Sequence, residues 1–217
     1  MNMAVAQTDP QQSIGQIAVN LPGATAIFRR LKLDFCCGGQ VPLSEAVAAK
    51  GLNLDVVVKA LSALERSDDT ATPTDPDALI AHILERYHAV HREQLPELIT
   101  MARRVEAVHK GHPDVPVGLA YLLEDMAQYL DSHMVKEETV LFPLLTTGGH
   151  ALAGMPMKMM RMEHTDHGES LDRLLSLTND AIPPLGACNT WRALYAGIDQ
   201  FRDDLINHIH LENNVLF

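Results

Sequence analysis

Hydrophobic residues recur at three- and four-residue spacing through most of the chain after about position 76, which places them on one face of an α-helix. This pattern predicts four long helices, over approximately residues 76–109, 117–147, 157–178 and 190–217. The breaks between them are rich in Gly and Pro, as in "GHPDVPVG" and "NDAIPPLGACN". Strand-like alternation of apolar and polar residues is absent. Because the connections are short enough to join antiparallel neighbours, we expect an up-down-up-down four-helix bundle.

The part of the chain before this bundle has a different pattern. Short apolar segments such as "LSEAVAAKG" and "LDVVVKALSALERS" predict small helices punctuated by glycine. Residues 67–76, "SDDTATPTDP", are polar and carry two prolines, a composition typical of a linker. We therefore predict an all-α protein of two domains, a small helical domain over residues 1–70 and the bundle over residues 77–217.

Composition and charge narrow the possible partners. A net charge of −11 argues against nucleic acid and anionic membranes, because both attract basic surfaces. No apolar run is long enough to span a bilayer, and the opening "MNMAVAQTDPQQ" lacks the basic and apolar regions of a secretory signal. Three cysteines, two of them adjacent, do not make a disulfide framework. We expect a cytoplasmic protein.

The predicted bundle contains an internal repeat. Residues 133–142, "HMVKEETVLF", and residues 208–217, "HIHLENNVLF", both read His, three residues, Glu, three residues, Leu-Phe. "HAVHRE" from His88 and "HTDHGE" from His164 form a second matching pair. The paired histidines are separated by 76 residues in one case and 75 in the other. Two similar helical hairpins are therefore expected to face each other across one core.

The repeated residues have the chemistry of metal ligands. Residues four apart on a helix share a face, so His133 lies beside Glu137 and His208 beside Glu212, with Leu-Phe extending each face inward. A buried carboxylate without a partner is costly, so each favours a cation. Imidazole with carboxylate suits iron, zinc or manganese, and carboxylates on facing helices can bridge two metals. Any one histidine could be an ordinary core residue, but a symmetric set argues for six ligands: His88, His133, Glu137, His164, His208 and Glu212.

These motifs, together with "LDFCCGG", "YHAVHREQLPEL", "SHMVKEETVLFP" and "MEH", resemble the bacterial iron-sulfur cluster repair di-iron proteins, the RIC or YtfE/ScdA family. The resemblance runs over nearly the whole chain. It implies a small helical amino-terminal domain and a hemerythrin-like bundle that holds two non-haem irons, bridged by oxo and carboxylate groups, through the same six residues. It also implies a cytoplasmic homodimer that helps restore iron-sulfur proteins damaged by nitric oxide or peroxide.

The sequence departs from oxygen-carrying hemerythrins at two places. Their third helix typically has a histidine four residues after its first ligand, where this chain has Gly168. The last helix carries His-x3-Glu rather than the His-x4-Asp of the oxygen carriers. Fewer imidazoles should leave the irons more open and more exchangeable, which disfavours reversible oxygen carriage. Relatives commonly continue beyond "VLF", so we expect a short further tail.

Three functions need such open iron sites, and the sequence does not choose among them. The first is repair of damaged iron-sulfur clusters by supply of iron, with damaged iron-sulfur proteins as partners. The second is binding and scavenging of nitric oxide. The third is enzymatic, a reduction of nitric oxide or peroxide at the paired irons. We favour iron supply; the client proteins and the electron donor are not specified by the sequence.

For several other residues, the sequence gives weaker support for a functional role. Cys36 and Cys37 could take up metal, exchange electrons or contact a client protein. Alternatively, they are two partly buried thiols without a functional role. His91 and His167 are one turn from candidate ligands and are expected to support them or to lie on the surface rather than to bind metal. Glu163 is expected to orient a ligand, to line an access path or to be solvated.

Overall fold

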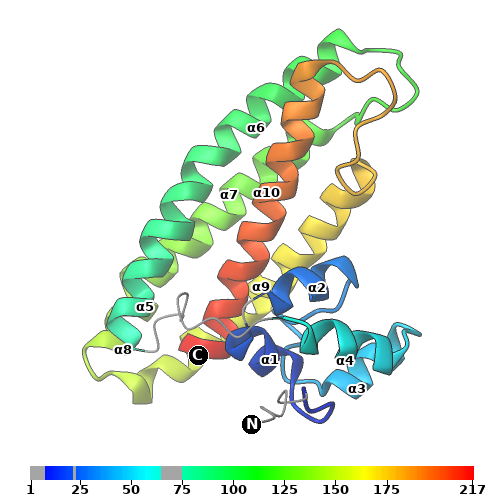
Figure 1. Cartoon of the computed structure of the whole chain (residues 1–217). Helices are drawn as coiled ribbons and strands as arrows, with labels where there is room; N and C mark the ends of the chain where they lie inside the picture. The colour runs from blue at the N-terminus through cyan, green and yellow to red at the C-terminus, as the bar shows by residue number, and fades with distance from the viewer. Residues whose placement is uncertain (1–7, 22, 65–74) are drawn as a thin grey trace. The chain divides into compact units, whose positions relative to one another are not determined.

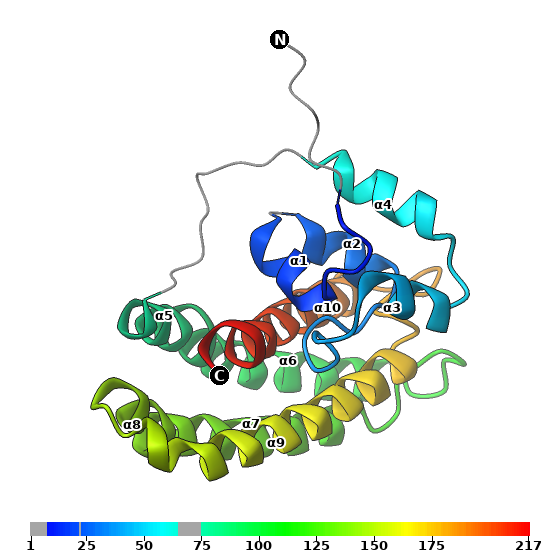
Figure 2. The same ribbon diagram turned by 90° about the horizontal axis from the view of Figure 1, so that it is seen from below.

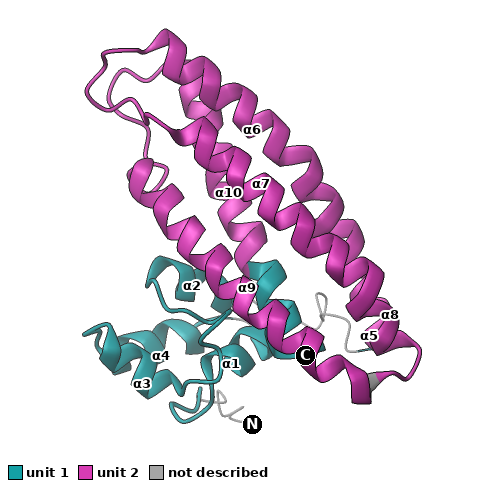
Figure 3. Cartoon of the chain, turned by 180° about the vertical axis from the view of Figure 1, so that it is seen from behind, with its two compact units in different colours: residues 1–75, 207–217 teal, residues 76–206 magenta. Residues whose placement is uncertain are grey.

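In a computed structural model of the chain, the described residues are 8–21, 23–64 and 75–217. Their regular structure is helical throughout, which confirms the predicted all-α class. The chain divides into two compact units, coloured separately in Figure 3: residues 1–75 with 207–217, and residues 76–206. None of the described helices has the length and apolarity to cross a membrane. The predicted linker lies almost entirely outside the described residues.

The second unit contains long helices that run alternately up and down (Figures 1 and 2). The first and second of them each include a π-helical turn, in which the hydrogen bonds span five residues instead of four. In chain order the segments are α5 (Pro76–Ile83), η2 (Leu84–His88), α6 (Ala89–Val108), α7 (Leu119–Lys136), η3 (Glu137–Leu141), α8 (Phe142–Thr146), α9 (His150–Leu177) and α10 (Asn189–Leu211), the last of which continues into the other unit. The expected up-down-up-down order is therefore present.

Helix α9 begins earlier than its sequence pattern predicts. We expected it from about residue 157, immediately after Pro156, but it starts at His150 and contains that proline. The turn before Pro156 includes Ala153, which is fully buried. Packing of this turn into the core therefore extends the helix past a residue that usually marks a boundary.

The core of the second unit follows the heptad-like spacing of its helices. Buried residues recur every three or four positions along α6, α7 and α10, among them Leu95, Leu98, Ala102, Leu123, Met126, Leu130, Leu194, Ile198 and Phe201. Helices α6 and α10 approach closely at Gly197, where an added Cβ would lie 2.7 Å from a Leu98 methyl carbon. This packing holds the faces of the helices that carry the candidate ligands.

The first unit is built from four short helices and the carboxyl-terminal segment of the chain. The helices are α1 (Ile14–Asn20), α2 (Ala24–Arg30), α3 (Leu43–Ala49) and α4 (Leu54–Ser62). Ser13 and Asn53 cap α1 and α4 by accepting backbone hydrogen bonds, as is typical of helix starts. Phe28 and Phe35 are buried together, with ring centroids 5.8 Å apart.

The carboxyl-terminal segment, residues 207–217, packs inside this first unit. It comprises the last turns of α10 and the π-helical turn η4 (Glu212–Leu216). The ring of His210 lies edge-on to Phe35 at 5.2 Å, and the Asn214 amide donates to the carbonyls of Phe35 and Cys36 at 3.3 and 3.2 Å. The boundary between the two compact units therefore falls at residue 207, inside the predicted bundle domain of residues 77–217. The bounds of that domain stay a prediction.

Candidate metal centre

Glu137 is the centre of the candidate site in the second unit. Its side chain is fully buried, and neither carboxylate oxygen accepts a hydrogen bond. Oε1 lies 3.2 Å from Nε2 of His133 and 4.0 Å from Nε2 of His164, while Oε2 lies 3.4 Å from Nε2 of His88. A buried carboxylate in such surroundings is costly unless a cation offsets its charge. With imidazoles facing both of its oxygens, Glu137 can serve two cations at once.

The imidazoles around Glu137 present nitrogen atoms suited to metal binding. The Nε2 atoms of His133 and His164 lie 3.1 Å apart, and the ligand atoms of these two histidines and Glu137 all lie within 4.8 Å of one another. Nδ1 of His133 faces a carboxylate, which can only accept, so the neutral ring carries its hydrogen there. Its Nε2 then has a lone pair directed toward Glu137. A borderline divalent metal fits this donor set.

Glu138 orients His88 on one side of the site. Its Oε1 accepts from Nδ1 of His88 at 2.8 Å and from Nη1 of Arg92 at 2.7 Å. Burial raises the pKa of the Glu138 carboxyl, but the hydrogen bonds from Arg92 and His88 outweigh it and lower the pKa below its ordinary value. The ionised carboxylate fixes the tautomer of His88 and strengthens its Nε2 as a ligand. Glu138 was not predicted from the sequence, because nothing in the local pattern distinguishes it from a solvated acid.

Glu163 orients His133 on the other side in the same way. Its Oε2 accepts from Nδ1 of His133 at 2.9 Å, and the Lys136 ammonium donates to its two oxygens at 2.5 and 2.6 Å. Burial raises the pKa of this carboxyl, while the hydrogen bonds from Lys136 and His133 lower it, with a net decrease. The sequence left open whether Glu163 orients a ligand, lines an access path or is solvated. It orients His133.

Replacement of Glu163 by Gln should weaken metal binding by about 10- to 100-fold, the usual effect of losing a carboxylate behind a histidine ligand. The amide has no charge to pair with Lys136 and does not fix the tautomer of His133 as firmly. Competition for bound iron with a coloured chelator would measure the change. Glu169→Gln, at an exposed position on the same helix, is the matched control. Equal iron retention by the two variants would show that Glu163 has no such role.

Three of the candidate ligands lie at π-helical turns. His88 ends η2, Glu137 begins η3 and Glu212 begins η4. In η4 the backbone N–H of Phe217 bonds to the carbonyl of Glu212, five residues earlier, at 2.8 Å. Turns of this kind insert one extra residue into a helix and are frequent at functional sites. The hydrophobic pattern of the sequence carried no signal for them.

The two remaining candidate ligands lie in the first unit. Nε2 of His208 is 3.1 Å from Oε1 of Glu212, one helical turn further on, and both side chains are almost fully buried. The pair has nearly the separation of His133 and Glu137 in the other unit. Each half of the sequence repeat thus contributes a buried histidine and carboxylate held together on one helix.

The neighbouring histidines are buried and do not lie on the surface. The ring of His167 stands edge-on to His133, with centroids 5.0 Å apart, and His91 packs edge-on against Phe201 at 5.5 Å. Both therefore belong to the packing around the ligands. At Gly168 an added Cβ would meet no atom within 4 Å, so the helix has room for a side chain there.

The two adjacent cysteines are held in the first unit. Their sulfur atoms are 3.8 Å apart, and Cys36 is half-buried while Cys37 is exposed. The hydrogen bond with Cys37 and burial raise the pKa of the Cys36 thiol well above its ordinary value. Cys36 is therefore a neutral thiol in this arrangement.

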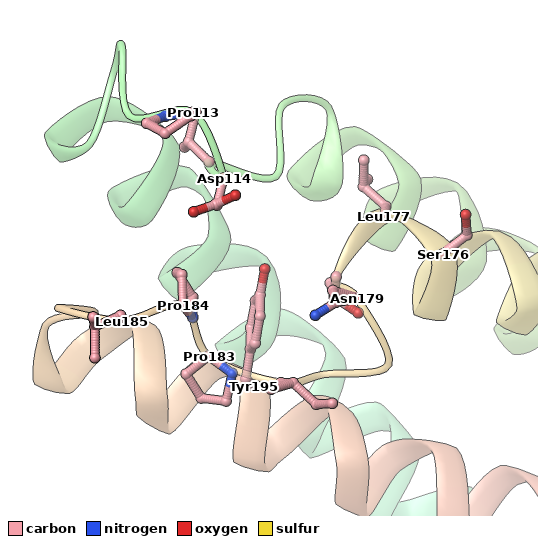
Figure 4. A pocket seen from close by; sticks show the side chains of 12 residues that line it. Pro113, Asp114, Ser176, Leu177, Asn179, Pro183, Pro184, Leu185 and Tyr195 are labelled. Carbon is pink, nitrogen blue, oxygen red and sulfur yellow. The ribbon is translucent and has the colours of Figure 1, made fainter.

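A separate pocket lies at the loops that end the long helices of the second unit (Figure 4). It has a volume of about 530 Å³ and is lined by residues of the α6–α7 and α9–α10 connections, including Asp114, Pro183 and Pro184, and by Tyr195. None of its lining residues is a candidate metal ligand. The pocket is therefore not part of the metal centre.

Comparison with known proteins matches both parts of the chain to known domain families. Residues 79–217 match the Hemerythrin HHE cation binding domain, and residues 10–65 match ScdA_N, a domain of unknown function. A probable iron-sulfur cluster repair protein of Haemophilus influenzae is 47% identical, with 95% of each chain covered. Iron-sulfur cluster repair proteins YtfE of Pectobacterium atrosepticum and Dickeya chrysanthemi are 49% and 47% identical, again with 95% of each chain covered. All six candidate ligands lie within the segment that matches the cation binding domain.

Proposed function

Because this chain belongs to the family of iron-sulfur cluster repair proteins with a hemerythrin-type cation binding domain, we propose that it repairs damaged iron-sulfur clusters by supplying iron from a di-iron centre. The damage is that caused by nitrosative or oxidative stress. The observation that carries the proposal is the buried Glu137, whose two oxygens face different imidazoles. This arrangement suits a carboxylate shared by two metal ions.

The proposed centre uses all six candidate ligands. His88, His133, Glu137 and His164 come from the second unit, and His208 with Glu212 complete the set. Support for the last two comes from their place in the sequence repeat and from a His–Glu separation close to that of His133 and Glu137. We propose two irons per chain, with Glu137 and Glu212 as bridging carboxylates and an oxo group between the irons. When bound, iron supplies both an exchangeable cation and redox chemistry.

The protein's own groups bind the irons firmly enough to retain them but leave them exchangeable. Glu138 and Glu163 keep His88 and His133 in the tautomers that bind metal, which favours retention. Gly168 stands where an oxygen carrier has a further imidazole, and the space beside it is open. Metal affinity follows the number and geometry of ligands, so this absence favours release. A retained but exchangeable iron is what donation requires.

Replacement of Gly168 by His tests donation directly. The added imidazole should slow iron loss to a chelator several-fold and slow the repair of a purified, damaged iron-sulfur protein to a similar extent. Gly154→His is the matched control, because it makes the same change at another helical glycine with open space around it. Both variants gain about 0.5 kcal/mol of helix propensity, so the comparison removes that contribution. Faster repair by a tighter-binding Gly168 variant would contradict labile iron as the mechanism.

The open position at Gly168 also favours a second candidate, the binding or reduction of nitric oxide. Addition of nitric oxide to the reduced protein without oxygen separates the possibilities. Donation predicts repair activity that scales with iron lability. Scavenging predicts uptake of nitric oxide that falls in the Gly168→His variant, with negligible repair by either form. Enzymatic reduction predicts a reduced gaseous product while iron is retained.

The resemblance also implies a cytoplasmic homodimer that acts on damaged iron-sulfur proteins. The names of the relatives support damaged iron-sulfur proteins as targets, whereas the dimer and the location stay predictions. Sedimentation of the iron-loaded chain would test the dimer, and fractionation of cells the location.

A further inference from the structure

The segment between α2 and α3 is a tightly organised loop around two thiols. Oδ1 of Asp34 accepts from the backbone N–H of Cys37 at 2.9 Å, and Oδ2 accepts from the N–H of Gly38 at 3.0 Å. The Cys36 thiol also lies 3.3 Å from Oδ1 of Asp34. One carboxylate thus folds the backbone back on itself and brings both sulfur atoms to its own side of the turn.

The glycines after the cysteines make this turn possible. An added Cβ at Gly38 would lie 2.9 Å from the Asp34 carbonyl oxygen, and one at Gly39 would lie 2.6 Å from the Phe35 carbonyl oxygen. Both distances are shorter than real Cβ atoms accept. The motif "DFCCGG" therefore specifies one compact conformation, with Phe35 buried beneath it.

The spacing of the donor atoms in this loop suits a metal ion. The two sulfur atoms are 3.8 Å apart, far beyond the disulfide bond length of about 2.05 Å. Two thiolates at about 2.3 Å from a tetrahedral metal are separated by about 3.8 Å. The ligand atoms of Asp34, Cys36 and Cys37 all lie within 4.8 Å of one another. The loop therefore has the geometry of a chelate before any metal binds.

We propose that Asp34, Cys36 and Cys37 form a second metal site, which takes a divalent cation with affinity for thiolate, Fe(II) in the functioning protein. The cation replaces one proton on each thiol, both protons pass to solvent, and no group is oxidised or reduced. Three protein ligands leave a tetrahedral ion with one further position. A thiolate of another protein can occupy that position, so the ion can be passed on by ligand exchange.

The loop is fixed to the segment that carries two ligands of the proposed di-iron centre. The side-chain amides of Asn213 and Asn214 donate to the carbonyl of Cys36 at 3.1 and 3.2 Å. Asn213 directly follows Glu212 in the chain. The thiol site receives iron released from the centre and transfers it to the damaged protein, a step that rests on the proposed function. The backbone of one short segment then links the two sites.

Titration of the reduced, iron-loaded full chain with Cd(II) in the absence of oxygen tests the site. Thiolate ligands give cadmium a charge-transfer absorption in the ultraviolet, at shorter wavelength than the aromatic side chains, which carboxylate and imidazole ligands do not. One equivalent should produce the band, and the band should be lost in Cys36→Ser and in Cys37→Ser. Cys188→Ser, which removes the remaining cysteine, should keep it. Persistence of the band in either of the first two variants, or its absence from the native chain, would overturn the proposal.

A measurement on the native chain tests the site without relying on variants that could misfold. Cd(II) should protect Cys36 and Cys37, but not Cys188, from an alkylating reagent, as read by mass spectrometry of the peptides. Protection of all three cysteines or of none would refute a local site. Asp34→Asn should weaken cadmium binding about tenfold or more, because the carboxylate is the third ligand and also holds the loop.

The transfer role is tested apart from the di-iron centre. A Cys36→Ser, Cys37→Ser double variant that retains both irons of the proposed di-iron centre should repair a damaged iron-sulfur protein several-fold more slowly than the native chain. Unchanged repair by that variant would refute transfer through the thiols. It would leave the proposed function intact, because that function is judged by the iron content and by the Gly168→His comparison.

Discussion

Replacement of Glu137 by Leu is expected to abolish the spectroscopic signal of paired irons and to leave less than one iron per chain. One oxygen of this carboxylate faces His88 and the other faces His133. Leucine preserves bulk but offers no ligand atom, so neither metal position keeps its full donor set. Iron analysis together with Mössbauer or electron paramagnetic resonance spectra would measure the loss.

The same substitution should have the opposite effect on the metal-free protein. Without a cation, Glu137 is a fully buried carboxylate whose oxygens accept no hydrogen bond, so an apolar replacement is expected to stabilise the apo form by about 1–3 kcal/mol. Thermal unfolding of both apo proteins would show this. Glu97→Leu, on the exposed face of α6, is the control and should change neither quantity appreciably. A variant that lost iron and also lost apo stability would show structural damage instead of a missing ligand.

Removal of residues 1–75 is the second change expected to have a large effect, although these residues include none of the six ligands. The segment that carries His208 and Glu212 packs in one unit with the amino-terminal helices, through His210 against Phe35 and Asn214 against the Cys36 loop. A chain that starts at Pro76 should therefore retain fewer than two irons and release them faster to a chelator.

Co-expression provides the control for this truncation. Residues 1–75 and 76–217 produced as two separate chains should reassociate and restore iron binding, because what is lost is packing and not a ligand. Asn214→Ala in the full chain removes the hydrogen bonds to the Phe35 and Cys36 carbonyls and should give a smaller loss in the same direction. Full iron loading by the truncated chain would mean that the carboxyl-terminal segment holds its ligands without help.

The helices and the candidate ligands could be predicted because both repeat along the chain. Apolar residues at helical spacing predicted the four long helices, with an appreciable error only at the start of α9, where packing of Ala153 overrides Pro156. The two copies of His-x3-Glu predicted buried candidate ligands without knowledge of the fold. The structure buries all six, as a metal centre requires, and family comparison confirms the resemblance that the motifs suggested.

Features that depend on single tertiary contacts could not be predicted in this way. Glu138 and Glu163 act through hydrogen bonds to residues 50 and 30 positions away, and no local pattern distinguishes them from solvated acids. The packing of residues 207–217 with the amino-terminal helices depends on Phe35 and Asn214, which are distant in sequence. The sequence left open whether His91 and His167 support the candidate ligands or lie on the surface, and aromatic neighbours distant in sequence bury them.

The π-helical turns make the length of these helices critical to a single residue. Deleting one residue within η3 would close this turn to the regular hydrogen bonding of an α-helix and would leave the flanking helical segments close to their original register. The helix would become more regular, but the backbone at Glu137 would lose the wide turn that sets the direction of its side chain. Insertions and deletions should therefore be tolerated in the connecting loops and excluded from the turns that begin or end with a ligand, however well the altered helix itself would form.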